Sequence, residues 1–160
     1  MLVFRKKQFL SACAVVFSVF ALAPAAGASV RTSAVTGLLQ AVNHTRVAHG
    51  LRPLTVDTTL VRAARSHSTE MLNGNFFAHG DFHSRMVAFH VVGPVAGENL
   101  AWGNGPYASP SSIISEWLAS PEHRANLLHA GWTRIGIGIS QGTFLGNGGS
   151  SVVTADFAGR

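Results

Sequence analysis

Apolar positions recur along the first half of the chain at the spacing of amphipathic helices. One series predicts a helix that Thr32 or Ser33 caps and Gly50 ends; its apolar positions are Val35, Leu38, Leu39, Val42 and Val47. Asp57 is a good N-cap for a second helix, which Gly74 ends. The apolar face of this second helix comprises Leu60, Val61, Ala64, His67 or Ser68, Met71 and Leu72.

Between residues 75 and 108 the pattern becomes irregular, and several aromatic residues lie there. A loop of this length in a compact domain is usually functional, although a short helix over residues 84–90 is compatible with the pattern. Two helix-start signals follow, Ser109-Pro110 and Ser120-Pro121, each with proline in the first turn, where its missing N–H is tolerated. They predict a helix that restarts and continues to Leu128.

The periodicity changes in the C-terminal third of the chain. Isoleucines alternate with glycines over residues 135–139, which predicts a strand with one bulky face and one bare face that a helix can approach closely. Residues 145–150 are rich in glycine and are expected to form a hairpin loop, with a return strand over 151–158. Helices followed by an antiparallel sheet indicate an α+β domain.

The N-terminus has the three parts of a secretory signal peptide. Basic residues at positions 5–7 precede an apolar segment that runs from Phe9 to about Ala23, and Ala26-Gly27-Ala28 has the small-x-small form of a cleavage site. We therefore expect residues 1–28 to be removed and residues 29–160 to form one secreted domain, either extracellular or held in the periplasm or cell envelope. An uncleaved membrane anchor is the alternative, but the apolar run of roughly 14 residues is shorter than the ~20 that span a bilayer.

Composition narrows the class of protein. With 47% hydrophobic and 12% charged residues, the chain is not a disordered protein. Its formal charge of +5 falls to +2 from Ser29 onward, where nine Arg and seven acidic residues remain, and no basic patch supports nucleic-acid binding. Cys13 is the only cysteine and lies in the predicted signal peptide. The mature domain therefore lacks disulfides and a cysteine nucleophile, which is suggestive of a bacterial source.

The candidate chemistry rests on His79, Glu98 and His123, because the sequence has no Gly-x-Ser-x-Gly elbow and no His-Glu-x-x-His zinc motif. Two imidazoles and one carboxylate can hold a divalent metal ion with open positions or perform general acid–base catalysis. Gaps of 19 and 25 residues do not by themselves bring the three together, so each histidine could instead bond locally. His67, beside the apolar stripe of the second helix, is expected to be structural.

Several motifs occur in an order typical of one protein family. They are Asn43-x-x-Arg46-x-x-x-Gly50-Leu51-x-Pro53-Leu54, Ala64-x-x-His67-Ser68-x-x-Met71, Gly97-Glu98-Asn99-Leu100-Ala101-Trp102, Trp117-Leu118-x-Ser120-Pro121-x-His123-Arg124-x-Asn126-Leu127-Leu128 and Ile135-Gly136-Ile137-Gly138. From about Leu38 to Phe157 the chain thus resembles the bacterial branch of the CAP superfamily, which includes cysteine-rich secretory proteins, antigen 5 and pathogenesis-related class 1 proteins. The resemblance implies a three-layer α-β-α sandwich with a central antiparallel sheet.

The resemblance also implies a cleft lined by two histidines and two acidic residues, which in some members holds a divalent cation. His79 and His123 match the histidine positions and would be the metal ligands, with zinc the expected ion, and Glu98 matches the first acid. Ser120 stands at the position of the second acid and is also placed as a helix N-cap, so cation affinity should be lowered. Asn99 is expected to tie the Glu98 segment to backbone groups.

The three tryptophans divide between the cleft and the core. Trp102 lies close behind Glu98 in the sequence and is expected to form a wall of the cleft. Trp117 and Trp132 are expected to pack in the core and between helix and sheet.

Two functions of different classes follow. The first is an extracellular binding module for a lipid, glycan, peptide or protein, favoured because the cleft has no activated nucleophile and an incomplete set of acids. The alternative is a metal-assisted, peptidase-like hydrolase, in which His79 and His123 bind the cation and Glu98 is the catalytic residue that activates water. Enzymatic activity stays an open question, with the balance against it. A scaffold without a ligand is a third interpretation, expected if the three side chains are buried without an opening.

Overall fold

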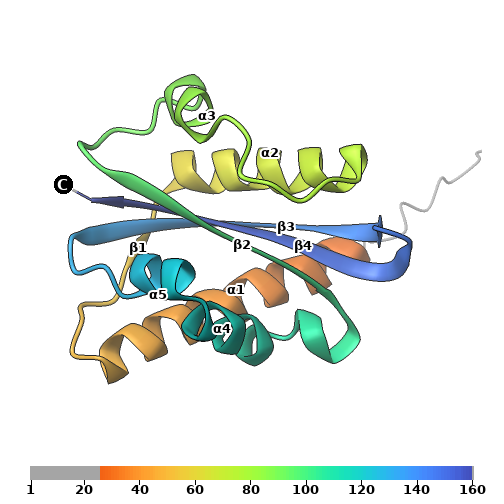
Figure 1. Ribbon diagram of the computed structural model, residues 1–160, viewed down its shortest axis with the longest axis horizontal. Helices are drawn as coiled ribbons and strands as arrows, with labels where there is room; N and C mark the ends of the chain where they lie inside the picture. Colours follow the sequence, from red (N-terminus) through yellow and green to blue (C-terminus); the bar gives the residue numbers. More distant parts are fainter. Residues whose placement is uncertain (1–25, 160) are drawn as a thin grey trace, which may run out of the picture.

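A computed structural model describes residues 26–159, which form a sandwich of three layers (Figure 1). The helices are α1 (Ala26–Ala48), α2 (Thr58–Gly74), α3 (Phe82–Ala88), α4 (Pro110–Ala119) and α5 (Pro121–Leu127), with a 3₁₀ turn over Gly105–Ala108. The strands are β1 (Thr55–Val56), β2 (Ala96–Asn104), β3 (Trp132–Phe144) and β4 (Asn147–Gly159). Most of the predicted signal peptide, residues 1–25, lies outside the described residues.

The four strands form one sheet in the order β1-β3-β4-β2. Strand β4 pairs antiparallel with both β3 and β2, and the two-residue β1 adds a parallel edge to β3. Figure 1 shows α2 and α3 over one face of the sheet and α1, α4 and α5 over the other. The predicted α+β class and three-layer sandwich are therefore confirmed, with the antiparallel sheet extended by one short parallel strand.

The first helix begins earlier than the sequence pattern predicts. Helix α1 starts at Ala26, so Thr32 and Ser33 lie inside it and the prediction that one of them caps it is wrong. Residues 26–31, which precede them, contain no proline, so the helix is not interrupted there. The predicted cleavage after Ala28 falls within this helix.

The second helix has the predicted start and a slightly different end. Asp57 has an extended backbone, and its side chain accepts hydrogen bonds from the backbone N–H groups of Thr59 and Leu60. Gly74 is the last helical residue, and Asn75 takes the left-handed conformation, with φ 52°. An asparagine can replace glycine in this role because its short polar side chain tolerates positive φ.

The segment predicted to be irregular holds both a helix and a strand. Helix α3 begins and ends two residues before the expected helix over 84–90, and β2 occupies Ala96–Asn104. Residues 98–101 are all buried, so apolar and polar side chains do not alternate along β2. The period-2 signal of a half-buried strand is therefore absent, and the prediction of a long loop is wrong.

The C-terminal hairpin is tighter than predicted. Strand β3 ends at Phe144 and β4 already begins at Asn147, so most of the expected loop over 145–150 belongs to the sheet. Leu145 and Gly146 form the turn with φ of 47° and 80°. Positive φ at both residues matches the twist that a two-residue hairpin turn needs.

The bare face of β3 lies against α2, as predicted. A Cβ at Gly136 would lie 2.1 Å from the carbonyl carbon of Leu60, and a Cβ at Gly138 would lie 2.3 Å from that of Ala64. No side chain fits at either position, so the two glycines set the distance between α2 and the sheet. The opposite face of the sheet carries the largest core cluster, which includes Leu38, Val42, Trp117, Trp132, Ile135 and Ile137 from the predicted core.

Two polar residues of α1 fasten the loop and helix around it. The Asn43 side chain donates to the carbonyl of Leu54 (3.0 Å) and accepts from its N–H (2.8 Å). Arg46 is fully buried and donates to the carbonyls of Arg52 (3.1 Å) and Leu127 (2.8 Å). These bonds join α1 to the segment before β1 and to the end of α5.

Candidate functional site

The structure brings His79 and Glu98 together at the edge of the sheet. Glu98 lies on β2 with its side chain 2% exposed, and His79 lies on the loop between α2 and α3 with its side chain 54% exposed. The distance from Nδ1 of His79 to Oε1 of Glu98 is 2.7 Å. Because a carboxylate only accepts hydrogen bonds, Nδ1 carries the proton. In the neutral ring Nε2 is then the atom that can accept a hydrogen bond or a proton.

Arg85 occupies the other oxygen of Glu98. Its guanidinium, on α3, lies 2.5 Å from Oε2 of Glu98 and also donates to the backbone carbonyl of His79 (3.2 and 3.3 Å). The side chain is only 9% exposed. This contact was not predicted from the sequence, although Arg85 is the only arginine between positions 66 and 123. Both oxygens of Glu98 are therefore occupied, one by an imidazole and one by a guanidinium.

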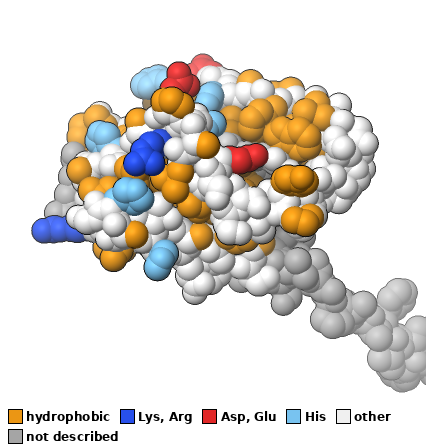
Figure 2. All heavy atoms as spheres, turned by 60° about the horizontal axis from the view of Figure 1, so that its bottom comes forward, with side chains coloured by type: hydrophobic (Ala, Val, Ile, Leu, Met, Phe, Trp, Pro, Cys, Tyr) orange, Lys and Arg blue, Asp and Glu red, His pale blue; other side chains and the backbone are white. Residues whose placement is uncertain are grey.

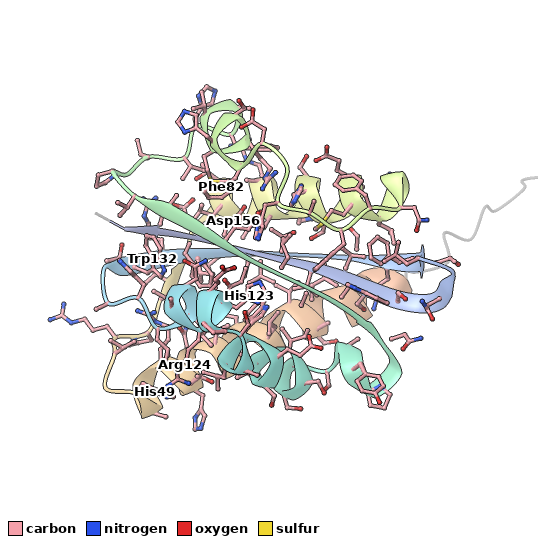
Figure 3. All side chains as sticks on the ribbon, viewed as in Figure 1. His49, Phe82, His123, Arg124, Trp132 and Asp156 are labelled. Atoms are coloured by element: carbon pink, nitrogen blue, oxygen red, sulfur yellow. The ribbon has the colours of Figure 1, made fainter. Side chains whose placement is uncertain are left out.

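A second buried acid, Asp156, lies next to Glu98 and was also not predicted. It is fully buried on β4, directly paired with Glu98 across the strands. Figure 3 shows Asp156 on the side of the sheet that faces α3. Burial raises the pKa of Asp156 well above its ordinary value and the charge of Glu98 raises it further, while Arg85 opposes both. The available signal was the single charged residue within the return strand predicted over 151–158.

Because its pKa is raised, Asp156 should keep its proton to a higher pH in the folded protein than in the unfolded chain. No donor among the described residues reaches its two carboxyl oxygens, whereas a protonated Asp156 can itself donate to Glu98. The native state then binds more protons than the unfolded state above pH ~4. The contribution of Asp156 to the free energy of unfolding therefore falls as the pH rises from there toward the raised pKa.

We predict that Asp156→Asn removes this decline. The amide keeps the shape and can donate to Glu98 without titrating, so the free energy of unfolding should fall less steeply above pH 4 than in the wild type. The difference in slope should approach about 1.4 kcal/mol per pH unit, the value for one proton. Urea unfolding between pH 4 and 8 measures it, and parallel curves for the two proteins would contradict a protonated Asp156.

His123 comes from the opposite face of the sheet, which α5 covers (Figure 1). It lies on α5, and the Asn99 side chain donates to its backbone carbonyl (2.9 Å), which confirms the predicted role of Asn99. Burial lowers the pKa of His123 and the nearby His79 lowers it further, against opposing effects of Glu122 and Glu116. The pKa of this half-buried ring is thus lowered partly by the charge of the other histidine.

Helices α4 and α5 also cover the outer edge of β2. Trp117 donates from Nε1 to the carbonyl of Leu100 (2.9 Å), and Asn126 donates from its side chain to the carbonyl of Glu98 (3.0 Å). An edge strand with such partners is protected from pairing with another chain. These bonds also hold Glu98 in place from the side opposite Arg85.

Ser120 and Trp102 contribute less to the cleft than expected. Ser120 stands at the N-cap of α5 with an extended backbone, but its side chain makes no capping hydrogen bond, so that predicted role is not realised. Trp102 lies on the same face of β2 as Glu98, four residues further along, and its ring packs on Phe144 with the ring centroids 5.5 Å apart. It belongs to the apolar cluster of Phe144 and Leu100.

His67 has the structural role that was predicted for it. It is 1% exposed, and its Nε2 lies 2.9 Å from the carbonyl oxygen of Ala78. Its Nδ1 lies 3.2 Å from a carboxylate oxygen of Glu70. Because Ala78 directly precedes His79, these contacts fasten the loop that carries the exposed imidazole.

A cavity of about 320 Å³ lies beside α3, and Ala96, two residues before Glu98 on β2, is part of its lining. Polar and apolar atoms both line it, and the lining residues are Phe82, His83, Met86, Val87, Val91, Gly93, Pro94 and Ala96. The opposite face of the molecule, formed by α1, α4 and α5, carries scattered histidines and apolar side chains, and its described residues form no continuous basic patch (Figure 2). That face gives no support to nucleic-acid binding.

The side chains present do not fit a divalent metal ion. Among the described residues, no three His, Cys, Asp or Glu side chains gather in a way that could hold one. The carboxylate oxygens of Glu98 accept from Arg85 and His79. A protein zinc site usually has at least three side-chain ligands. His79 and His123 alone lack the carboxylate that would complete the set.

The match to a known family covers most of the chain. Residues 39–157 match the family model described as CAP, the cysteine-rich secretory protein family. The chain is 31% identical over 128 residues to the uncharacterized protein YkwD of Bacillus subtilis (strain 168), a match that covers 77% of this chain and 46% of that protein. It is 32% identical over 117 residues to the uncharacterized membrane protein YlbC of the same organism, covering 70% and 33%. The chain therefore spans less than half the length of these curated relatives.

Solved structures share the fold. An extracellular protein containing a SCP domain from Bacillus anthracis matches with a TM-score of 0.74 and 25% identity, over 88% of this chain and 45% of that one. A cysteine-rich secretory protein from Staphylococcus aureus matches with a TM-score of 0.67 and 18% identity, over 81% and 39%. An outer surface protein from Borrelia burgdorferi matches with a TM-score of 0.64 and 20% identity, over 80% and 94%. All three are bacterial proteins.

Proposed function

Because the chain belongs to the CAP, or cysteine-rich secretory protein, family, we propose that it acts outside the cell as a binding module whose cleft presents His79 to the ligand. The names of the relatives from B. anthracis and B. burgdorferi place those proteins outside the cell or at its surface. Within residues 26–159, no helix is long and apolar enough to cross a bilayer. Secretion through the signal peptide of residues 1–28 is part of this proposal.

The observation that carries the proposal is the pair of His79 and Glu98. The exposed imidazole is held by a buried carboxylate 2.7 Å away, so its position and its tautomer are set before any ligand arrives. A side chain that is ordered in advance binds with less loss of conformational entropy. His79 is thus the group that contacts the ligand, and Glu98 positions it.

The chemistry of Nε2 favours a ligand with O–H or N–H donors. A neutral imidazole offers a single acceptor there, which suits the hydroxyl and amide groups of glycans and peptides. The ionised phosphate of an anionic lipid offers only acceptors at neutral pH and fits this atom poorly. The cavity beside α3, with apolar side chains such as Phe82, Met86 and Val91 in its lining, makes a lipid the competing ligand, so the experiment includes it.

The metal-assisted hydrolase receives no support from the contacts. Water activation by Glu98 needs a carboxylate oxygen that faces the cleft, but the Glu98 side chain is only 2% exposed and each of its oxygens already faces a donor.

We predict that His79→Ala weakens binding of soluble peptidoglycan fragments about tenfold, equal to ~1.4 kcal/mol, because one hydrogen bond to the ligand is lost. Isothermal titration calorimetry at pH 7.5 measures the affinity. His44→Ala is the matched control, since His44 is exposed on α1 and remote from the cleft, and it should bind as the wild type does.

Two outcomes would refute the proposal. Equal affinity of the wild type and His79→Ala for the fragments would remove His79 from the ligand contact. Failure of the wild type to bind the fragments, together with His79-independent binding to phosphatidylglycerol vesicles, would instead assign the molecule to lipid surfaces.

A further inference from the structure

The cleft contains a cation of its own. Arg85 donates to Oε2 of Glu98 at 2.5 Å and to the carbonyl of His79 at 3.2 and 3.3 Å. We propose that Arg85 is the resident cation of this cleft: it fills the place at Glu98 that a divalent ion would need, and so makes the wild-type cleft insensitive to divalent metal while it positions His79. This role of Arg85 is independent of which ligand His79 contacts.

Burial of the ion pair keeps a metal ion away from Glu98. Arg85 and Glu98 have side chains only 9% and 2% exposed, so each charge has been taken out of water and depends on the other. The guanidinium also rests over the ring of Phe82, with its central carbon 5.6 Å from the ring centroid. A metal ion could reach Glu98 only by expelling this side chain, which would leave the guanidinium without its carboxylate.

The remaining ligand atoms are too few for a tight site. Nδ1 of His79 is directed at Oε1 of Glu98, and a metal ion can bind an imidazole nitrogen only when that nitrogen carries no proton. The guanidinium therefore removes Oε2 of Glu98 as a potential ligand by binding it directly. It also helps to hold Glu98 in the position from which Oε1 keeps Nδ1 of His79 protonated. Only Nε2 of His79 and the half-buried ring of His123 are left, short of the three ligands that zinc usually takes.

Deletion of the guanidinium frees one oxygen of Glu98. Without Arg85, Oε2 of Glu98 loses its ion-pair partner, while Oε1 still faces Nδ1 of His79. A carboxylate oxygen and an imidazole nitrogen are ligands that divalent ions accept. The wild-type cleft thus carries an arginine at the carboxylate that a metal ion would need.

The test is zinc titration by calorimetry on the purified protein and its Arg85 variants. We expect Arg85→Ala to bind zinc about tenfold or more tightly than the wild type, and Arg85→Lys, which keeps the positive charge, to resemble the wild type. The double variant Arg85→Ala/His79→Ala should lose the gain. Arg62→Ala is the matched control, because Arg62 also lies over an aromatic ring, that of Phe89 at 5.9 Å, yet is remote from Glu98.

Several results would overturn the inference. One is tight zinc binding by the wild type that disappears in His79→Ala/His123→Ala. Another is an Arg85→Ala protein that is folded by circular dichroism and no more sensitive to zinc than the wild type. If Arg85→Ala does not fold, Arg85→Gln replaces it. NMR of the wild type gives an independent test, in which the chemical shifts of the ring nitrogens of His79 should not change on addition of zinc. A change in the shift of Nδ1 would contradict a resident guanidinium.

Discussion

Gly136→Ala should destabilise the protein by about 3 kcal/mol or more, because the added methyl group has nowhere to go. Its Cβ would lie 2.1 Å from the carbonyl carbon of Leu60 and 2.2 Å from the backbone nitrogen of Val61. Both atoms belong to the backbone of α2, so no side-chain rotation can relieve the overlap. Helix α2 would have to move away from the sheet and take with it the packing of Leu60 on the core. Urea unfolding at neutral pH measures the loss.

Gly148→Ala is the matched control. Gly148 lies on β4, is exposed, and has no atom within 4 Å of the position its Cβ would take. The same substitution there should change the free energy of unfolding by no more than about 0.5 kcal/mol. Similar losses in the two variants would mean that alanine is unfavourable in these strands for a reason other than the approach of α2.

Glu98→Ala should destabilise the protein by about 3–5 kcal/mol, because it leaves a buried guanidinium without its partner. Arg85 is 9% exposed, and without Glu98 its remaining bonds go to the carbonyl of His79. Thermal and urea unfolding measure this effect. A loss of ligand binding in this variant therefore has to be interpreted together with its stability, whereas His79→Ala removes a largely exposed side chain.

A second substitution separates the ion pair from other effects of Glu98→Ala. In Glu98→Ala/Arg85→Met the charge left without a partner is gone, so a large part of the stability should return. Glu122→Ala, which removes an exposed acid from the first turn of α5, should change the stability by about 0.5 kcal/mol or less. If the double variant is as unstable as Glu98→Ala alone, the uncompensated charge of Arg85 is not the cause.

The local signals in the sequence predicted several elements well. Three helix starts were recognisable from Asp57 before an apolar series and from the prolines directly after Ser109 and Ser120. The first-turn N–H groups of a helix need a nearby acceptor or a residue without an N–H, and both are supplied by neighbouring residues. The glycines of β3 predicted a close helix contact because a strand face without side chains lets the backbone of a helix approach it. Such features are encoded within a few residues, so the pattern alone reveals them.

The family motifs also identified His79 and Glu98 as members of one site before any distance was known. They could not indicate which atoms of Glu98 remain accessible. That depends on α3, a seven-residue helix whose Arg85 reaches back across the loop to β2. The sequence offered no periodic signal for this contact, because a single ion pair leaves no pattern.

The sequence by itself determined the family, the main helices and the close approach of α2 to β3, since each rests on a local pattern or an ordered set of motifs. Only the tertiary structure decided the chemical state of the cleft. Strand pairing brings Asp156 beside Glu98, although the two are 58 positions apart along the chain. The packing of α3 places Arg85 in contact with the carboxylate of Glu98. Burial and charge depend on which groups meet in space, and that meeting is a property of the folded chain.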